Sequence, residues 1–266
     1  MTKRLLYVGD WNRGLFGAGM NVIGGGLCSL DDPGSADMAV LDRVPENAGD
    51  AFKAILTKTQ RILCVPPLSL AGGDGGKFLR AAKRSGVTMT AMETPRFHPG
   101  LATVLEIVGS GVLGKNLQAV LKRRGNWPFF PVPRDGNTRS DWWDRMCLYQ
   151  IGALENGRVE TSEEDRFDIE LILVGSTGRL CHRQWLREDG VCEWTVDSDM
   201  GANGGRTRGG HLPVELPLAI ELSQGFRSPA TPLTNRGVDI WTTRERKICG
   251  DAAVPSPCHG AGKMKE

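Results

Sequence analysis

The chain has 266 residues, 40% of them hydrophobic, which is enough to bury the core of one large domain or of two smaller ones. Its formal charge is only +2 and its basic residues are scattered, which excludes the basic footprint of a nucleic-acid-binding protein. The apolar start is interrupted at Asp10, too early for a signal peptide, and no apolar run reaches the roughly 20 residues that cross a bilayer. We therefore expect a cytoplasmic protein with no membrane partner.

The seven cysteines are odd in number and irregular in spacing, and several lie inside apolar runs. This pattern is typical of reduced core thiols rather than of a disulfide framework. No two cysteines have the two-residue spacing of a zinc knuckle, so the sequence predicts no metal site.

Residues 1–95 alternate strand and helix patterns, which predicts a domain built on a parallel sheet. Apolar runs that end at glycine, proline or aspartate predict strands at 5–8, 26–30, 37–41, 61–65 and 87–92. Helical spacing of apolar residues predicts helices at 49–58 and 78–84. Open parallel sheets bind ligands beyond the carboxyl ends of their strands, so we expect a ligand at the loops that follow these strands.

The turn after the first predicted strand is rich in glycine. Gly9 and Gly14 occupy the first and third positions of the GxGxxG pattern, in which backbone N–H groups meet a pyrophosphate at a helix amino terminus. Trp11 stands at the second position, where its bulk would obstruct the usual pose. Asp31 follows about 20 residues later, where a carboxylate can accept from a ribose 2′-hydroxyl, although Asp31-Asp32-Pro33-Gly34 is equally an ordinary turn.

Residues 96–249 are predicted to form a second, α+β domain. The patterns predict helices at 101–111, 141–156 and 216–226, and strands at 116–122, 167–174, 179–183 and 191–196. The glycine- and arginine-rich segment 201–210 is predicted to be an exposed, mobile loop and a candidate substrate lid. The tail at 250–266 is predicted to be disordered.

Three motifs resemble the domain junction of the Gfo/Idh/MocA family of NAD(P)-dependent oxidoreductases. They are Cys64-Val65-Pro66-Pro67, Arg96-Phe97-His98-Pro99 and Ser110-Gly111-Val112-Leu113-Gly114. The spacing from Asp37 through Pro45 to Lys58 also matches a passage of that family. The resemblance implies an α/β fold, in which a shortened Rossmann-like parallel sheet domain is followed by an α+β domain with an open antiparallel sheet. It also implies NAD or NADP as cofactor, with contacts at Gly9, Gly14, Asp31, Pro45 and Pro66.

The resemblance also implies positions for catalytic groups, and two of them hold unexpected residues. Pro66 stands where the family has a lysine that contacts nicotinamide and substrate. Aligning Asp144 with the aspartate of the family's Asp-x-x-x-His motif places Leu148 at the acid/base histidine, and Tyr149 is the nearest titratable neighbour, about 100° further round the helix.

The remaining candidates for a substrate site come from the same motifs. The groups available to take a hydroxyl proton are Asp144, Tyr149 and His98. Arg96 is a candidate for placing an anionic group of the substrate, and Trp142 for stacking on a sugar ring. Packing at the edge of the core is the commoner role of such residues and is the alternative for both Tyr149 and Trp142.

Two hypotheses for function follow. The first is an NAD(P)-dependent oxidoreductase acting on a CH–OH group of a sugar or another hydroxyl-bearing small molecule. The second is a catalytically silent family member that senses a ligand or binds a partner, which Pro66, Leu148 and Trp11 favour; a cofactor-free lyase or isomerase lacks a base constellation. We also expect a homo-oligomer through the open antiparallel sheet, formed by residues 169, 171 and 173 or by their alternating neighbours.

Overall fold

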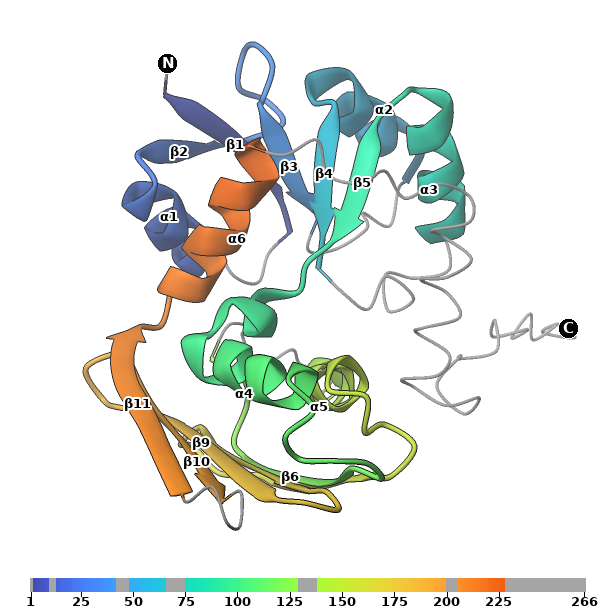
Figure 1. The fold of residues 1–266 in the computed structure, drawn as a ribbon. Helices are drawn as coiled ribbons and strands as arrows, with labels where there is room; N and C mark the ends of the chain where they lie inside the picture. Colours follow the sequence, from blue (N-terminus) through green and yellow to red (C-terminus); the bar gives the residue numbers. More distant parts are fainter. Residues whose placement is uncertain are drawn as a thin grey trace, which may run out of the picture.

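The computed structural model describes residues 2–9, 13–41, 48–65, 75–128, 138–199 and 205–227. These residues form two units, each built on one sheet (Figure 1). The amino-terminal unit has a five-stranded parallel sheet, and the second unit has a six-stranded, mostly antiparallel sheet. This arrangement confirms the α/β fold class predicted from the sequence.

The parallel sheet has the strand order β2-β1-β3-β4-β5. Its strands are β1 (Lys3–Val8), β2 (Gly25–Cys28), β3 (Met38–Leu41), β4 (Arg61–Cys64) and β5 (Thr88–Ala91). Every residue of β3 is buried, because a parallel sheet is covered on both faces. Each fully buried leucine or valine side chain contributes about 1.5–3 kcal/mol, which is why β3 is an unbroken apolar run in the sequence.

Four helices cover the parallel sheet. They are α1 (Arg13–Val22), α2 (Ala48–Lys58), α3 (Gly75–Arg84) and α6 (Leu216–Arg227). Figure 1 shows α1 and α6 beside β1 and β2, and α2 and α3 on the side of β5. Helix α6 follows the second sheet in sequence but returns to the first unit, where Leu218 and Leu222 join the core that contains Phe16 and Met20. The first unit is therefore completed by the end of the described chain.

The connection from β2 to β3 contains no helix and runs back to the amino-terminal edge of the parallel sheet (Figure 1). Arg4 donates from Nη2 to the carbonyl of Pro33 at 3.0 Å, and the Lys58 ammonium donates to the carbonyl of Asp32. Because β2 and β3 lie on opposite sides of β1, the strand order reverses between β1 and β3. In open α/β sheets this switch point is where ligands bind.

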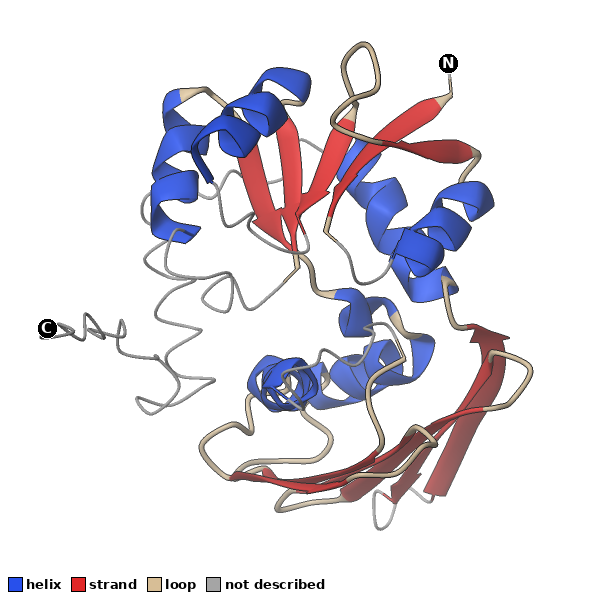
Figure 2. Ribbon diagram, turned by 180° about the vertical axis from the view of Figure 1, so that it is seen from behind, coloured by secondary structure: helices blue, strands red, loops and turns tan. Residues whose placement is uncertain are grey.

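The second sheet has the order β11-β10-β9-β8-β6-β7. Its strands are β6 (Gln118–Arg124), β7 (Gly157–Ser162), β8 (Asp168–Val174), β9 (Arg179–Leu186), β10 (Val191–Asp199) and β11 (Gly205–Pro213). Helices α4 (Pro99–Gly109) and α5 (Thr138–Gln150) lie over one face, and the other face is open (Figure 2). Ile169, Leu171 and Leu173 are buried on the covered face, so only their alternating neighbours remain for the predicted oligomer contact.

The predicted loop at 201–210 was wrong for residues 205–210, which belong to β11. Glycine and arginine have little preference for strands, but β11 pairs with β10 at nine consecutive positions, from Gly205 to Pro213. Hydrogen bonds to a neighbouring strand outweigh the intrinsic strand preference of these residues. Sequence patterns report only the intrinsic preference.

The predicted helix from 141 to 156 was too long, because α5 ends at Gln150. Gly152 has φ +74°, and its N–H donates to the carbonyl of Tyr149 at 3.0 Å. The N–H of Ala153 donates to the carbonyl of Leu148 at 3.0 Å, and these two bonds form the Schellman motif that closes helices. The residues after this motif lead into β7, a strand that the sequence patterns did not predict.

The described helices include none long and apolar enough to cross a membrane. The five cysteines in the described ranges are free thiols, and four of them are buried. Burial raises the pKa of Cys192 to about 12, so this thiol stays protonated and packs as a small apolar group. The prediction of reduced core thiols is confirmed for the four buried residues, whereas Cys181 is a free thiol that is only half-buried.

Candidate functional site

The carboxyl ends of the parallel strands face η2 (Thr94–Phe97) and α4, at the junction of the two units (Figure 1). Residues 10–12, 42–47 and 66–74, which follow β1, β3 and β4 in the sequence, lie outside the described residues. The predicted cofactor contacts Pro45 and Pro66 fall in these gaps, as does Trp11. The described part of the site therefore consists of the strand ends, the first turn of α1, and the η2–α4 turn.

Gly9 and Gly14 are both brought to this edge. Gly9 follows β1 directly and has φ +153°, a backbone conformation that residues with a side chain rarely adopt. Gly14 lies in the first turn of α1, and a Cβ added there would meet no atom within 4 Å. In the usual motif the third glycine allows close packing of helix and strand, whereas here its absent side chain leaves open space beside a helix amino terminus.

Asp31 is not brought to this edge. It is exposed, and it lies in the β2–β3 connection that Arg4 and Lys58 hold at the amino-terminal edge of the sheet. Its neighbour Asp32 accepts from the N–H of Ser29 at 2.7 Å, a bond that holds the pKa of the Asp32 carboxyl below its usual range. This geometry is that of a turn, which was the other interpretation of the segment.

His98 caps the amino terminus of α4. Its Nδ1 accepts from the N–H of Gly100 at 3.2 Å, and the side chain is fully buried. Burial, with a smaller contribution from the neighbouring His182, lowers the pKa of His98 to about 3, so the ring is neutral. A Cβ at Gly100 would lie 2.4 Å from His182, so this packing requires glycine. In this position His98 orders the junction, and its side chain is closed off from solvent.

Arg96 occupies the preceding turn and is the exposed member of the motif. Its side chain is 60% exposed, and Nη1 donates to Glu93 Oε2 at 3.1 Å. An exposed ion pair of this kind contributes little to stability, so the guanidinium remains available to an anionic group. Of the two polar side chains in the motif, the structure exposes Arg96 and buries His98.

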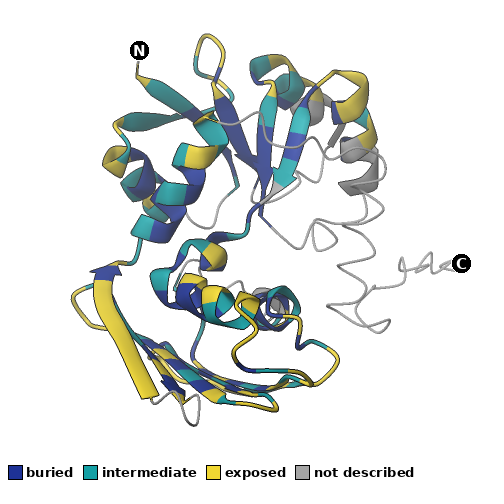
Figure 3. Cartoon of the chain, viewed as in Figure 1, coloured by how far each residue is buried: buried dark blue, intermediate teal, exposed yellow. Residues whose placement is uncertain are grey.

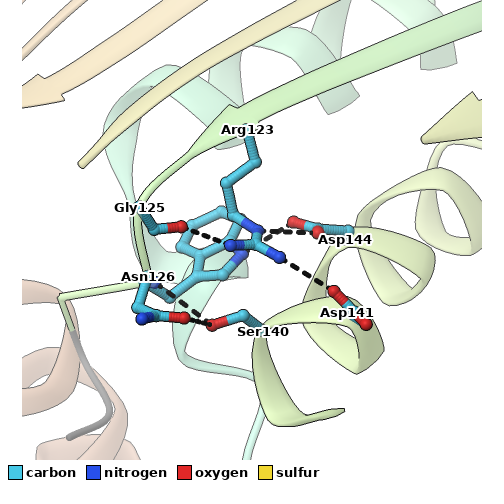
Figure 4. A network of polar contacts seen from close by, with 7 residues as sticks. Arg123, Gly125, Asn126, Ser140, Asp141 and Asp144 are labelled. Atoms are coloured by element: carbon cyan, nitrogen blue, oxygen red, sulfur yellow. Dashed lines mark hydrogen bonds and ion pairs between the residues drawn. The ribbon is translucent and has the colours of Figure 1, made fainter. Parts of the chain in front are cut away.

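Asp144 is buried in a network that joins α5 to β6 (Figure 4). Its Oδ2 accepts from Arg123 Nε at 2.8 Å, and its Oδ1 accepts from Trp127 Nε1 at 2.8 Å. Arg123 also donates to Asp141 Oδ1 at 2.8 Å and to the carbonyl of Gly125. Burial raises the pKa of Asp144 to about 6, and the charge of Arg123 opposes this rise. Both oxygens of Asp144 are thus committed to structural partners.

Sequence patterns did not identify Arg123, although a signal was present. Ala119, Leu121 and Arg123 alternate along β6 and all are buried on its covered face. The alternation predicts an inward side chain at 123, and a buried arginine requires an acidic partner. The signal was missed because the strand was predicted to end at 122.

Tyr149 and Leu148 stand near the end of α5. Leu148 is buried in the core, so the position that the resemblance assigns to a histidine holds an apolar core residue here. Tyr149 is half-buried and packs against the same core. Trp142 lies on α5, one turn after its start, and its side chain is outside the description. Tyr149 is therefore the predicted proton carrier that keeps some exposure.

Glu221 on α6 is a buried acid that the sequence analysis did not single out. Its Oε1 accepts from the N–H of Glu93 at 2.5 Å, and its Oε2 accepts from Thr94 Oγ1 at 2.6 Å. Burial raises the pKa of Glu221 to about 7; the two hydrogen bonds lower it and the nearby charge of Glu93 raises it. This carboxyl links α6, which returns to the first unit, to residues 93–94, where the chain leaves that unit.

Comparisons with known proteins support the fold. No protein-family model matches the chain, and neither does any curated protein. Among solved structures it is similar to KijD10, a 3-ketoreductase from Actinomadura kijaniata in complex with NADP and TDP-benzene, with 12% identity, a TM-score of 0.59, and coverage of 93% of this chain and 95% of that chain.

Two further solved structures show the same likeness. An oxidoreductase from Agrobacterium radiobacter in complex with NAD+, L-tartaric acid and magnesium has 12% identity and a TM-score of 0.57, covering 95% of this chain and 96% of that one. A super-repressor mutant of Gal80p from Saccharomyces cerevisiae has 11% identity and a TM-score of 0.57, covering 84% and 87%. The chain thus has an oxidoreductase-like fold, which a repressor protein also adopts.

Proposed function

We propose that this chain is an NAD(P)-dependent oxidoreductase of the Gfo/Idh/MocA family, acting on a CH–OH group of a sugar or another hydroxyl-bearing small molecule. The switch point is the observation that carries the proposal. There β1 and β3 end side by side, and the first turn of α1 has open space at Gly14. The neighbours solved with NAD+ and with NADP support a dinucleotide as the ligand.

The described residues that fit the cofactor are Gly9 and Gly14. Backbone N–H groups at the amino terminus of α1 would hold the pyrophosphate, because a helix amino terminus favours negative charge. A bound nicotinamide supplies the group that exchanges a hydride with the substrate carbon. Asp31 has no place in this proposal, since it lies at the opposite edge of the sheet.

The remaining roles fall to residues around η2 and α5. Arg96 binds an anionic group of the substrate, and Tyr149 holds or releases the hydroxyl proton. Asp144 and His98 become positioning residues: Asp144 fixes α5, which carries Tyr149, and His98 fixes the start of α4, next to Arg96.

Cofactor binding tests the proposal through two matched helical glycines. Gly14 and Gly109 each lie in a helix with no atom within 4 Å of an added Cβ. In calorimetric titration with NAD+, NADH, NADP+ and NADPH, at least one should bind saturably. Gly14→Leu is expected to weaken that binding tenfold or more by filling the phosphate space, whereas Gly109→Leu should leave it within twofold. Absence of binding to all four at millimolar concentration contradicts the oxidoreductase proposal.

A catalytically silent member that senses a ligand or binds a partner is the second candidate. The burial of Asp144 and His98 and the apolar Leu148 favour it, because only Tyr149 is left among the predicted proton carriers. The similar structure of Gal80p supports this second candidate, because that structure is described as a super-repressor mutant and has this fold. Tyr149→Phe distinguishes the two: an oxidoreductase should lose roughly 10²–10⁴-fold in turnover with cofactor affinity kept, whereas a sensor keeps its affinity and has no turnover to lose.

We also propose that the open face of the second sheet forms a homo-oligomer contact. Ile172 and Val174 lie on this face, and Val174 is 44% exposed. Glu170 is surrounded there by Lys122 and Arg183, whose ion pairs supply charges of both signs for a self-complementary surface. Sedimentation equilibrium of the full chain should show a dimer or a larger oligomer. A monomer at all concentrations up to about 100 μM contradicts the contact.

A further inference from the structure

A cavity at the carboxyl end of α4 lies away from the junction of the two units. Its volume is about 380 Å³, and it lies between the last turn of α4 and the covered face of β10 and β11. Small-molecule sites occupy about 300–1,000 Å³. Because α4 has 11 residues and rises about 1.5 Å per residue, the cavity is roughly 15 Å along the helix from His98. It is therefore separate from the proposed cofactor site.

Arg206 and Arg208 bring unbalanced positive charge to this cavity. On the covered face they stand opposite Ser198 and Val196 of β10, so the strand ladder supplies no acid beside them. The acid of β10 at Asp197 accepts instead from Thr207 on the open face, at 2.8 Å.

The acids near the two arginines do not cancel their charge. Glu106 lies 3.3 Å from Arg208 Nη1, but these side chains are 68% and 50% exposed, so the contact is weak. In the described ranges no acid lies within ion-pair distance of Arg206. Arg206 therefore holds a charge that has no internal partner among those residues.

The hydroxyl groups of the cavity do not compete with the arginines as donors. Ser110 Oγ donates to the carbonyl of Ile107 at 2.7 Å, and Ser198 Oγ donates to the carbonyl of Arg206 at 3.2 Å. The hydrogens that remain for a ligand belong to the guanidinium groups, which pair best with planar or multivalent oxyanions. The carboxyl end of α4 carries about half a negative charge, so an anion is directed away from the helix and toward β11.

The helix side and the floor of the cavity carry an apolar patch, beside Glu106 and Ser110. Val112 is one of the few large apolar residues with substantial exposure in the described part of the chain, at 38%. It lines the cavity together with Ile107 and the buried Val196. Figure 3 shows β11 exposed along nearly its whole length, so the arginine side is open to solvent. The cavity thus has an apolar patch and a cationic side, with the exposed Glu106 beside Arg208.

We propose that this cavity binds a small amphipathic anion, a carboxylate or phosphate joined to an apolar group. The oxyanion lies against Arg206 and Arg208, and the apolar group covers Ile107, Val112 and Val196. Neither side alone suffices: inorganic phosphate lacks the apolar contact, and a neutral alcohol lacks the charge.

Calorimetric titration of the full chain with four probes tests the proposal. Hexanoate or hexyl phosphate should bind saturably, and the stronger of the two identifies the oxyanion; inorganic phosphate and hexanol should bind at least tenfold more weakly. Arg206→Ala should weaken the stronger probe tenfold or more, because charge-assisted hydrogen bonds are lost. Arg179→Ala removes an exposed arginine from the open face of β9 and should change the affinity by less than twofold.

A second variant addresses the apolar side. Val112→Glu places a negative charge at an exposed position beside the proposed ligand, so it should abolish binding while leaving the melting temperature unchanged. The proposal is overturned if neither six-carbon probe binds saturably, if Arg206→Ala and Arg179→Ala weaken binding equally, or if Val112→Glu binds like the wild type.

Discussion

Replacing Arg123 with methionine is expected to lower the free energy of unfolding by about 3–5 kcal/mol, the cost of leaving a buried partner charge uncompensated. Arg123 and Asp144 are 1% and 0% exposed, so water cannot replace the lost guanidinium. Trp127 would remain as one donor to Asp144, and the carboxyl would protonate more readily than in the wild type. Urea unfolding at pH 8 measures the loss, which should shrink as the pH falls and Asp144 takes up a proton.

The double variant Arg123→Met with Asp144→Leu provides the control. With both charges removed, apolar packing should recover most of the lost stability, because a buried ion pair is often replaceable by well-packed apolar groups. If Arg123→Met costs less than about 1 kcal/mol, Asp144 does not depend on this network. The proposed role of Asp144 as a positioning residue would then be wrong, and Asp144 would again be a candidate for direct proton transfer.

Replacing Glu221 with glutamine is expected to remove the loss of stability that Glu221 contributes as the pH rises from about 4.5 to 7. The pKa of Glu221 is about 7 in the folded chain and about 4.5 in the unfolded chain, so the folded state binds more protons in this window. Its contribution is therefore complete below about pH 4.5 and is lost as the pH rises through 7. The difference amounts to about 3 kcal/mol.

The wild-type curve alone does not show this fall, because two histidines act in the opposite direction. Burial lowers the pKa of His98 to about 3 and of His182 to about 4, so their contribution to stability is lost as the pH drops below about 6.5. The measurement is therefore the difference in unfolding free energy between wild type and Glu221→Gln at each pH. That difference should shift by about 3 kcal/mol in favour of the variant from pH 4.5 to 8.

Glu106→Gln is the matched control for this titration, because it removes the charge of an exposed glutamate on α4. Its free energy of unfolding should stay within about 1 kcal/mol of the wild-type value at each pH, because an exposed ion pair contributes little. A flat difference for Glu221→Gln as well would mean that Glu221 titrates in the folded chain as it does in the unfolded chain. The buried carboxyl would then not be the proton-binding group at the junction.

Sequence patterns identified the elements whose burial is periodic and local. The strands of the parallel sheet were predicted because short apolar runs, such as the fully buried β3, mark a sheet that is covered on both faces. Strands β8, β9 and β10 were predicted because one face is covered and the residues alternate. Patterns failed at β11 and at the end of α5. In those places a partner strand and a glycine at positive φ decide the outcome, and neither is visible as hydrophobic periodicity.

At the candidate site, residue types were easier to predict than their environments. Gly9 and Gly14 are at the predicted edge, because a turn between a strand and a helix is set by neighbouring residues. His98 and Asp144 have the chemistry of proton carriers, but packing against β9 and β6 buries them. Asp144 also accepts a hydrogen bond from Arg123, which lies 21 positions away in the sequence. Asp31 is drawn to the opposite edge because the β2–β3 connection lacks a helix.

The sequence by itself determined the α/β class, the parallel sheet of the first unit and the antiparallel strands of the second, since these follow from local runs of apolar residues that must leave water. Only the tertiary structure decided which polar groups face solvent, because exposure depends on segments that meet from distant parts of the chain. Arg96 is therefore exposed and His98 is buried, although one residue separates them. Contacts between distant segments also bring Arg206 and Val112 to one cavity. They bury Glu221 of α6 against the segment at residues 93–94.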